Sequence, residues 1–158
     1  MSLLSRLPVI GSKFDKSHSG SKTAGYSTSS FSLPQDIGFE ELKKKLDGNE
    51  ITLIDVRAPS EHSKIGKIPN SKNIILEQVG TRILMPDDEF AEKCGFKKPH
   101  FDDPLAVNCF TGVRARTAQL AIMAVGYKNV RLYKGSFKDW KEQGGPVEYP
   151  PEPESVES

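Results

Sequence analysis

Short apolar segments alternate with amphipathic helical patterns along the middle of this sequence, and this alternation limits the possible folds more than any other feature. Four apolar segments have the length of buried strands, at 51–54, 73–75, 105–107 and 130–133. Helical patterns mark four further segments, at 39–46, 87–94, 115–125 and 136–143. The sequence therefore predicts an α/β fold with a mainly parallel, open sheet flanked by helices.

Length and charge restrict the domain count and the partners. The chain has 158 residues and a formal net charge of +1. One domain of ordinary size fits this length together with its tails, whereas a second copy does not. The basic residues are scattered among nearly as many acidic ones, so we expect no nucleic-acid partner. No apolar run is long enough to cross a bilayer, so we expect no membrane partner either.

Cysteine and histidine are scarce, which bears on metal binding. The chain contains Cys94 and Cys109, with three histidines, His18, His62 and His100. No pair of them has the spacing of zinc ligands, so we expect no structural metal. His62 and His100 have polar neighbours in the sequence, and we expect both at the surface.

The two ends of the chain differ in composition from its middle. Residues 1–32 are rich in serine, with four basic residues and one acidic residue. This composition resembles a mitochondrial transit peptide, so we expect a mitochondrial location. A disordered tail on a cytoplasmic protein is the alternative. Residues 148–158 are rich in proline and glutamate and are expected to form a disordered acidic tail, which leaves 33–147 as the folded domain.

Cys109 follows directly on the apolar segment 104–108 and precedes a short loop that leads into a predicted helix. Such a loop directs backbone N–H groups and the positive end of the helix dipole at the sulfur, which stabilises a thiolate. Gly112 permits the tight turn, while Arg114 and Arg116 add positive charge beside it. The alternative is a cysteine that only packs in the core. The combination favours Cys109 as a reactive nucleophile.

Functional sites of open α/β sheets lie beyond the carboxyl ends of the strands. Asp55 and Arg57 follow the first predicted strand, and we expect them to fix the loops there by ion pairing and by bonds to N–H groups. A direct catalytic role for Asp55 is less favoured. Cys94 lies in the last turn of a predicted helix whose N-cap is Asp87, and we expect this cysteine to be structural.

Four parts of the chain resemble the motifs of one known family. They are 53–57 (LIDVR) with Glu61, 66–74 (GKIPNSKNI), 107–114 (VNCFTGVR), and 126–130 (GYKNV) with Gly135, Trp140 and 145–147. Together they cover nearly all of the predicted domain and resemble the single-domain rhodaneses, which are thiosulfate sulfurtransferase-like proteins. Lys67 stands where that family usually has histidine, and Asn70 where it usually has glycine. Both lie away from Cys109 in the sequence.

The resemblance implies a sulfurtransferase that needs no cofactor. The Cys109 thiolate would take a sulfur atom from thiosulfate or a related small-molecule donor and hold it as a persulfide. It would then pass this sulfur to cyanide or to a thiol acceptor such as glutathione or thioredoxin. Backbone N–H groups of the loop would cradle the persulfide anion, those of Phe110, Thr111, Gly112 and Val113 among them. Arg114, with Arg116, would attract the anionic donor and stabilise the leaving sulfite.

Two other classes of protein are alternatives. Phosphatases and arsenate reductases of the same fold carry a His-Cys-x5-Arg loop. Here Asn108 precedes the cysteine, and only four residues separate Cys109 from Arg114. This loop is too short to encircle phosphate, so phosphatase activity is not expected. A rhodanese-like module that binds a partner or carries sulfur without catalysis is the stronger alternative, although such modules often lack the cysteine.

Overall fold

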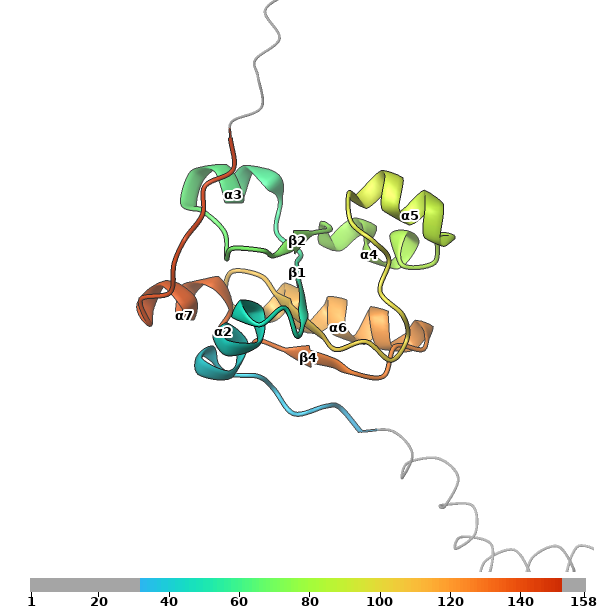
Figure 1. Cartoon of the computed structure of the whole chain (residues 1–158), viewed down its shortest axis with the longest axis horizontal. Helices are drawn as coiled ribbons and strands as arrows, with labels where there is room; N and C mark the ends of the chain where they lie inside the picture. Colours follow the sequence, from blue (N-terminus) through green and yellow to red (C-terminus); the bar gives the residue numbers. More distant parts are fainter. Residues whose placement is uncertain (1–31, 152–158) are drawn as a thin grey trace, which may run out of the picture. The chain divides into compact units, whose positions relative to one another are not determined.

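The computed structural model describes residues 32–151, in which helices and strands alternate (Figure 1). The elements follow in the order α2 (Phe39–Asp47), β1 (Thr52–Asp55), α3 (Pro59–Ile65), β2 (Lys72–Asn73), α4 (Leu76–Arg82), α5 (Asp87–Cys94), β3 (Leu105–Asn108), α6 (Val113–Val125), β4 (Val130–Leu132) and α7 (Ser136–Glu142). The strands form one parallel sheet in the order β2-β1-β3-β4. The predicted fold class is therefore confirmed. None of the helices in this part of the chain has the length and apolar character needed to span a bilayer.

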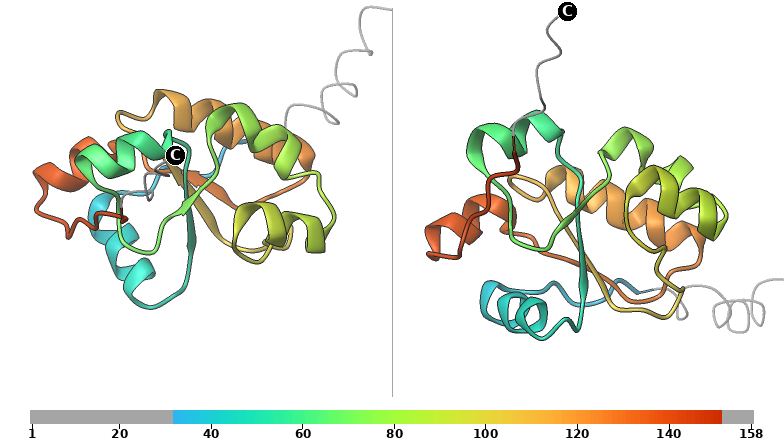
Figure 2. Two further views of the ribbon diagram at one scale, coloured as in Figure 1. Left: turned by 90° about the horizontal axis from the view of Figure 1, so that it is seen from above. Right: turned by 45° about the horizontal axis from the view of Figure 1, so that its top comes forward.

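Both faces of the sheet are covered, because successive residues of its central strands point to opposite sides. Leu53 lies opposite Ala106, and both join a core with side chains of α2 and α7. Ile54 lies opposite Val107, and both join a second core with side chains of α4, α5 and α6. Figure 2 shows α2 and α6 on opposite sides of the sheet. Burial on both faces explains why these strands are apolar runs instead of alternating patterns.

Helices α3 and α4 were not predicted. The α3 sequence, PSEHSKI, has too few apolar residues to show a helical stripe. It forms a helix because Pro59 suits the first helical position and Glu61 accepts a hydrogen bond from the Ala58 N–H at 3.1 Å. Helix α4 contains Gly80, which weakens the helical signal of its short sequence.

Several boundaries also differ from the prediction. Strand β2 is Lys72–Asn73 and helix α6 begins at Val113, two residues before the predicted start at 115. The expectation that Asp87 caps α5 is wrong, because Pro86 in extended conformation precedes the helix and Asp87 is its first residue.

The carboxyl-terminal boundary of the described fold lies beyond residue 147. Lys67 and Glu148 exchange two backbone hydrogen bonds, of 2.8 and 2.9 Å, in an isolated antiparallel bridge. Glu148, which we expected to begin the tail, is therefore paired with the domain. The predictions for 1–31 and 152–158 lie outside the described residues.

Candidate active site

Cys109 lies directly after β3, at the carboxyl edge of the sheet, and is 1% exposed. The start of α7 holds its backbone: the Cys109 N–H donates to Ser136 Oγ at 3.0 Å, and the Phe137 N–H donates to the Cys109 carbonyl at 3.0 Å. Ser136 adopts a φ of 57°, and its hydroxyl donates to the Tyr133 carbonyl at 2.8 Å. This serine fixes the backbone of Cys109 and is a site residue that we did not predict.

Two backbone N–H groups point at the sulfur of Cys109. Gly112 donates to Sγ at 3.0 Å and Ala115 at 3.4 Å. Both belong to the turn that leads into α6, so the positive end of this helix also faces the sulfur. Such an arrangement favours negative charge on sulfur, whether as a thiolate or as a persulfide. Ala115 is a donor that we did not predict.

Asp55 and Arg57, which we expected to fix the loops by ion pairing, pair with each other, and both side chains are fully buried. The Arg57 Nη2 donates to Asp55 Oδ2 at 2.8 Å and to the Gly66 carbonyl at 3.0 Å. The backbone N–H of Arg57 donates to Asp55 Oδ1 at 3.0 Å. The Arg57 guanidinium also stacks 4.4 Å from the centre of the Phe137 ring. The pair thus joins β1, the end of α3 and α7.

His62 belongs to the same buried cluster, so the expectation of a surface position is wrong for this residue. It is 5% exposed, and its Nε2 lies 3.3 Å from Asp55 Oδ2. Burial raises the pKa of Asp55, but its contacts with the nearby His62 and with Arg57 outweigh this effect and leave the pKa below its usual value. His100 is exposed, as predicted.

Asn108 connects this cluster to Cys109. Its amide nitrogen donates to the Cys109 carbonyl at 3.1 Å and lies 3.4 Å from Asp55 Oδ2. Asn108 is fully buried at the end of β3. The position just before the cysteine was a signal for this role, but its partner 53 residues away was not visible from the sequence.

Arg114 lies in the first turn of α6 and forms a bidentate ion pair with Glu61 of α3. Its Nη1 donates to Glu61 Oε2 at 2.8 Å and its Nη2 to Glu61 Oε1 at 3.1 Å. The hydrogen bond with Arg114 lowers the pKa of Glu61, and the same bond raises the pKa of Arg114. We predicted that Arg114 would bind the anionic sulfur donor, and we predicted no partner for it within the protein.

The remaining predicted residues of the loop and the start of α6 differ in exposure and contacts. Phe110 is half-buried and Thr111 is exposed, and Val113 is 75% exposed. Arg116 donates to Gln119 Oε1 at 2.6 Å and lies 3.8 Å from Asp36, so its charge is engaged by other side chains of the protein. A cavity of about 420 Å³ is lined by Thr111, Gly112, Val113, Arg116, Thr117, Leu132 and Lys134. A second cavity, of about 270 Å³, is lined by Ile65, Phe110, Lys138, Lys141 and Glu142.

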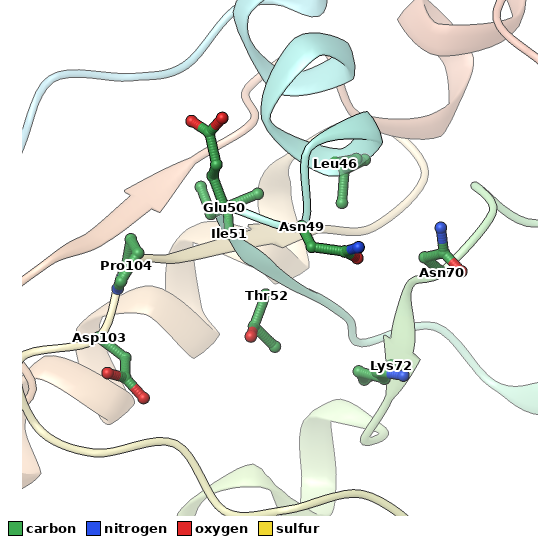
Figure 3. Close-up of a pocket in the computed structure, with 9 residues that line it drawn as sticks. All are labelled: Leu46, Asn49, Glu50, Ile51, Thr52, Asn70, Lys72, Asp103 and Pro104. Carbon is green, nitrogen blue, oxygen red and sulfur yellow. The ribbon is translucent and has the colours of Figure 1, made fainter.

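Other features lie apart from the loop. Cys94 ends α5 and is half-buried, and burial raises the pKa of its thiol, which keeps it protonated. A cavity of about 370 Å³ lies near Thr52 and Pro104, at the amino-terminal ends of β1 and β3, and Figure 3 shows the residues that line it. This cavity contains no cysteine or histidine and lies at the opposite edge of the sheet from Cys109. Within 32–151, no cluster of acidic, histidine and cysteine side chains has the arrangement of a metal site.

Comparisons with known proteins agree with this geometry. A rhodanese-like domain model matches residues 39–143. The chain is 38% identical to the mouse thiosulfate sulfurtransferase/rhodanese-like domain-containing protein 3 over 109 residues, which cover 69% of each chain. It is 38% identical over 103 residues to a putative mitochondrial thiosulfate sulfurtransferase of Schizosaccharomyces pombe, covering 65% of this chain and 72% of that protein.

A solved structure shows the same fold. The crystal structure of the Saccharomyces cerevisiae single-domain sulfurtransferase RDL2 superposes with a TM-score of 0.66 at 31% identity. The superposition covers 74% of this chain and 97% of that one. With the family model matched across most of the folded residues, the chain belongs to the rhodanese-like domain family.

Proposed function

We propose that this protein is a thiosulfate sulfurtransferase that carries sulfur as a persulfide on Cys109. The observation that carries the proposal is the 3.0 Å hydrogen bond from the Gly112 N–H to the buried sulfur. A cysteine that served only for packing would not need N–H donors directed at its sulfur. The names of the mouse and fission-yeast relatives support thiosulfate as the donor.

The proposed reaction has two half-reactions. The Cys109 thiolate attacks the outer sulfur of thiosulfate, and the sulfur–sulfur bond of the donor breaks as sulfite leaves with the electron pair. The product on the enzyme is the persulfide anion of Cys109. A thiolate acceptor, such as that of glutathione or thioredoxin, or cyanide then attacks the outer sulfur and restores the Cys109 thiolate. Since the donor product leaves before the acceptor reacts, ping-pong kinetics are expected.

The surrounding groups have distinct roles in this proposal. The N–H groups of Gly112 and Ala115 stabilise the negative sulfur, and neighbouring N–H groups of the loop receive the longer persulfide. Arg114 attracts the anionic donor and stabilises the leaving sulfite. Arg116 acts at longer range, because it is bound to Gln119. Asp55 and Arg57 support the loop from below.

The location is part of the proposal. The serine-rich and basic composition of residues 1–32, together with the mitochondrial name of the fission-yeast relative, supports import into mitochondria.

The proposal is tested by trapping the persulfide. After incubation with thiosulfate and gel filtration, the intact protein should gain the mass of one sulfur atom, and cyanide or a thiol should remove it. Cys109→Ser should abolish the adduct and the turnover, whereas Cys94→Ser, the matched control, should keep most of both. If no adduct forms on Cys109 and no donor is turned over, the chain is a binding module. Turnover that depends on Cys94 would contradict the assignment of the nucleophile.

A further inference from the structure

The partner of Arg114 bears on how the site recognises its donor. We propose that Glu61 determines the charge that the catalytic loop presents, because it is the counter-ion of Arg114 and thereby controls the preference between dianionic and monoanionic sulfur donors. This inference rests on the proposed sulfurtransferase function. Glu61 acts through Arg114 and is a positioning residue.

The geometry of the ion pair supports this role. Both terminal nitrogens of Arg114 donate to the two carboxylate oxygens of Glu61, at 2.8 and 3.1 Å. The side chains are 38% and 31% exposed, so water screens the pair only in part. In the resting protein, Glu61 therefore offsets most of the positive charge that Arg114 contributes to the loop.

Glu61 is held firmly in this position. The Ala58 N–H donates to its Oε2 at 3.1 Å, which closes the first turn of α3. The next residue, His62, lies 3.3 Å from Asp55, and the end of the helix is tied to Arg57 through the Gly66 carbonyl. Helix α3 is thus fixed to β1, and it presents Glu61 to α6 as a stationary negative charge.

Arg114 is also within electrostatic reach of the nucleophile. Arg114 lies in the first turn of α6, next to Ala115, whose N–H donates to the Cys109 sulfur at 3.4 Å. A donor that approaches the Cys109 sulfur is therefore exposed to the electrostatic field of both Arg114 and Glu61. Since Coulomb energy is proportional to the charge of the donor, the Glu61 carboxylate opposes thiosulfate, a dianion, about twice as strongly as a monoanion.

The experiment compares two donors that deliver the same sulfur atom. Thiosulfate releases sulfite and methanethiosulfonate, a monoanion, releases methanesulfinate. Both leave the Cys109 persulfide. In a ping-pong reaction, the kcat/KM for the donor reports only the first half-reaction, so it is measured for each donor at a fixed acceptor concentration. We expect Glu61→Gln to raise kcat/KM about fivefold for thiosulfate and about twofold for methanethiosulfonate at low salt.

Two variants separate charge from structure. Glutamine at position 61 still caps the helix, so Glu61→Gln should fold normally. Glu61→Asp keeps the charge, and it should leave the ratio of the two kcat/KM values at the wild-type value. Glu41→Gln is the matched control, because Glu41 forms the same bidentate pair with Arg131, at 2.6 and 2.9 Å, between α2 and β4. Glu41→Gln also removes one negative charge, but at a site away from the loop, so it should leave the kcat/KM of both donors unchanged.

The outcomes distinguish the inference from the function on which it rests. A higher thiosulfate-to-methanethiosulfonate ratio in Glu61→Gln alone supports the inference, and added salt should reduce the increase. An equal loss for both donors would mean that Glu61 only stabilises the fold, and the inference would be wrong. A ratio that rises as much in Glu61→Asp or Glu41→Gln would overturn it too. If the wild-type protein turns over neither donor, the proposed function itself is wrong.

Discussion

Gly112 meets two structural requirements at once. Its φ is +102°, a conformation that residues with a side chain rarely adopt. A Cβ placed on Gly112 would clash with the Lys134 carbonyl oxygen, which is part of the backbone and cannot easily move. The residue also donates the 3.0 Å hydrogen bond to the sulfur of Cys109. Fold and candidate chemistry therefore depend on the same backbone atoms.

Gly112→Ala should lower the free energy of unfolding by about 3 kcal/mol, because it adds a steric clash to the strain of positive φ. It should also slow persulfide formation, since relief of the clash moves the N–H away from the sulfur. Gly144→Ala is the control: Gly144 has a φ of +81°, but nothing lies within 4 Å of its Cβ position. This variant should lose only about 1 kcal/mol. Urea unfolding measures both, and equal losses would contradict the role of the clash.

Helix α3 provides two residues of the candidate site, although its sequence gives little indication of a helix. The helix has seven residues and no apolar stripe. Even so, Glu61 pairs with Arg114 and His62 lies beside Asp55, so this helix joins the Cys109 loop to the buried ion pair of Asp55 and Arg57. The buried cluster of Asp55, Arg57 and His62 therefore anchors both α3 and the Cys109 loop.

The contribution of this cluster to the stability of the fold should depend on pH. The pKa of Asp55 is lowered in the folded protein. Its ionised form therefore stabilises the fold above the unfolded-state pKa of about 3.9, and this contribution is lost as the pH falls through the folded-state value. Asp55→Asn should lower the free energy of unfolding by about 3 kcal/mol at pH 7, because Arg57 stays buried without its partner.

Denaturant unfolding across a pH series tests this expectation. The difference between wild type and Asp55→Asn should shrink below about pH 4. Asp47→Asn is the control, because the Asp47 side chain is 67% exposed and pairs with Lys43 at the surface. It should have little effect at any pH. A difference between wild type and Asp55→Asn that stays constant with pH would show that the Asp55 charge does not stabilise the fold.

For the whole molecule, the sheet separates two regions. Cys109 and the buried cluster lie at the carboxyl-terminal ends of the strands, whereas the cavity near Thr52 and Pro104 lies at the amino-terminal ends. The segment 1–32 differs from the rest of the chain in composition, and on this composition we base the proposed mitochondrial location.

A fusion of residues 1–33 to a fluorescent reporter should enter mitochondria, because this segment combines basic residues and serines with a single acidic residue. Microscopy and fractionation measure the location. Replacing Arg6, Lys13, Lys16 and Lys22 by glutamine should abolish import, and a reporter that stays diffuse with the native segment would show that it carries no mitochondrial address.

The sequence by itself determined the parallel α/β fold and the position of the Cys109 loop. Both follow from local order: apolar runs predict strands, and a cysteine between a strand and a helix fixes the direction of the loop. The tertiary structure alone decided the partners, such as Glu61 for Arg114, 53 residues away, and the burial of His62. The physical reason is that these contacts depend on the strand order β2-β1-β3-β4, which brings α3 beside the start of α6, and local periodicity contains no information about that order.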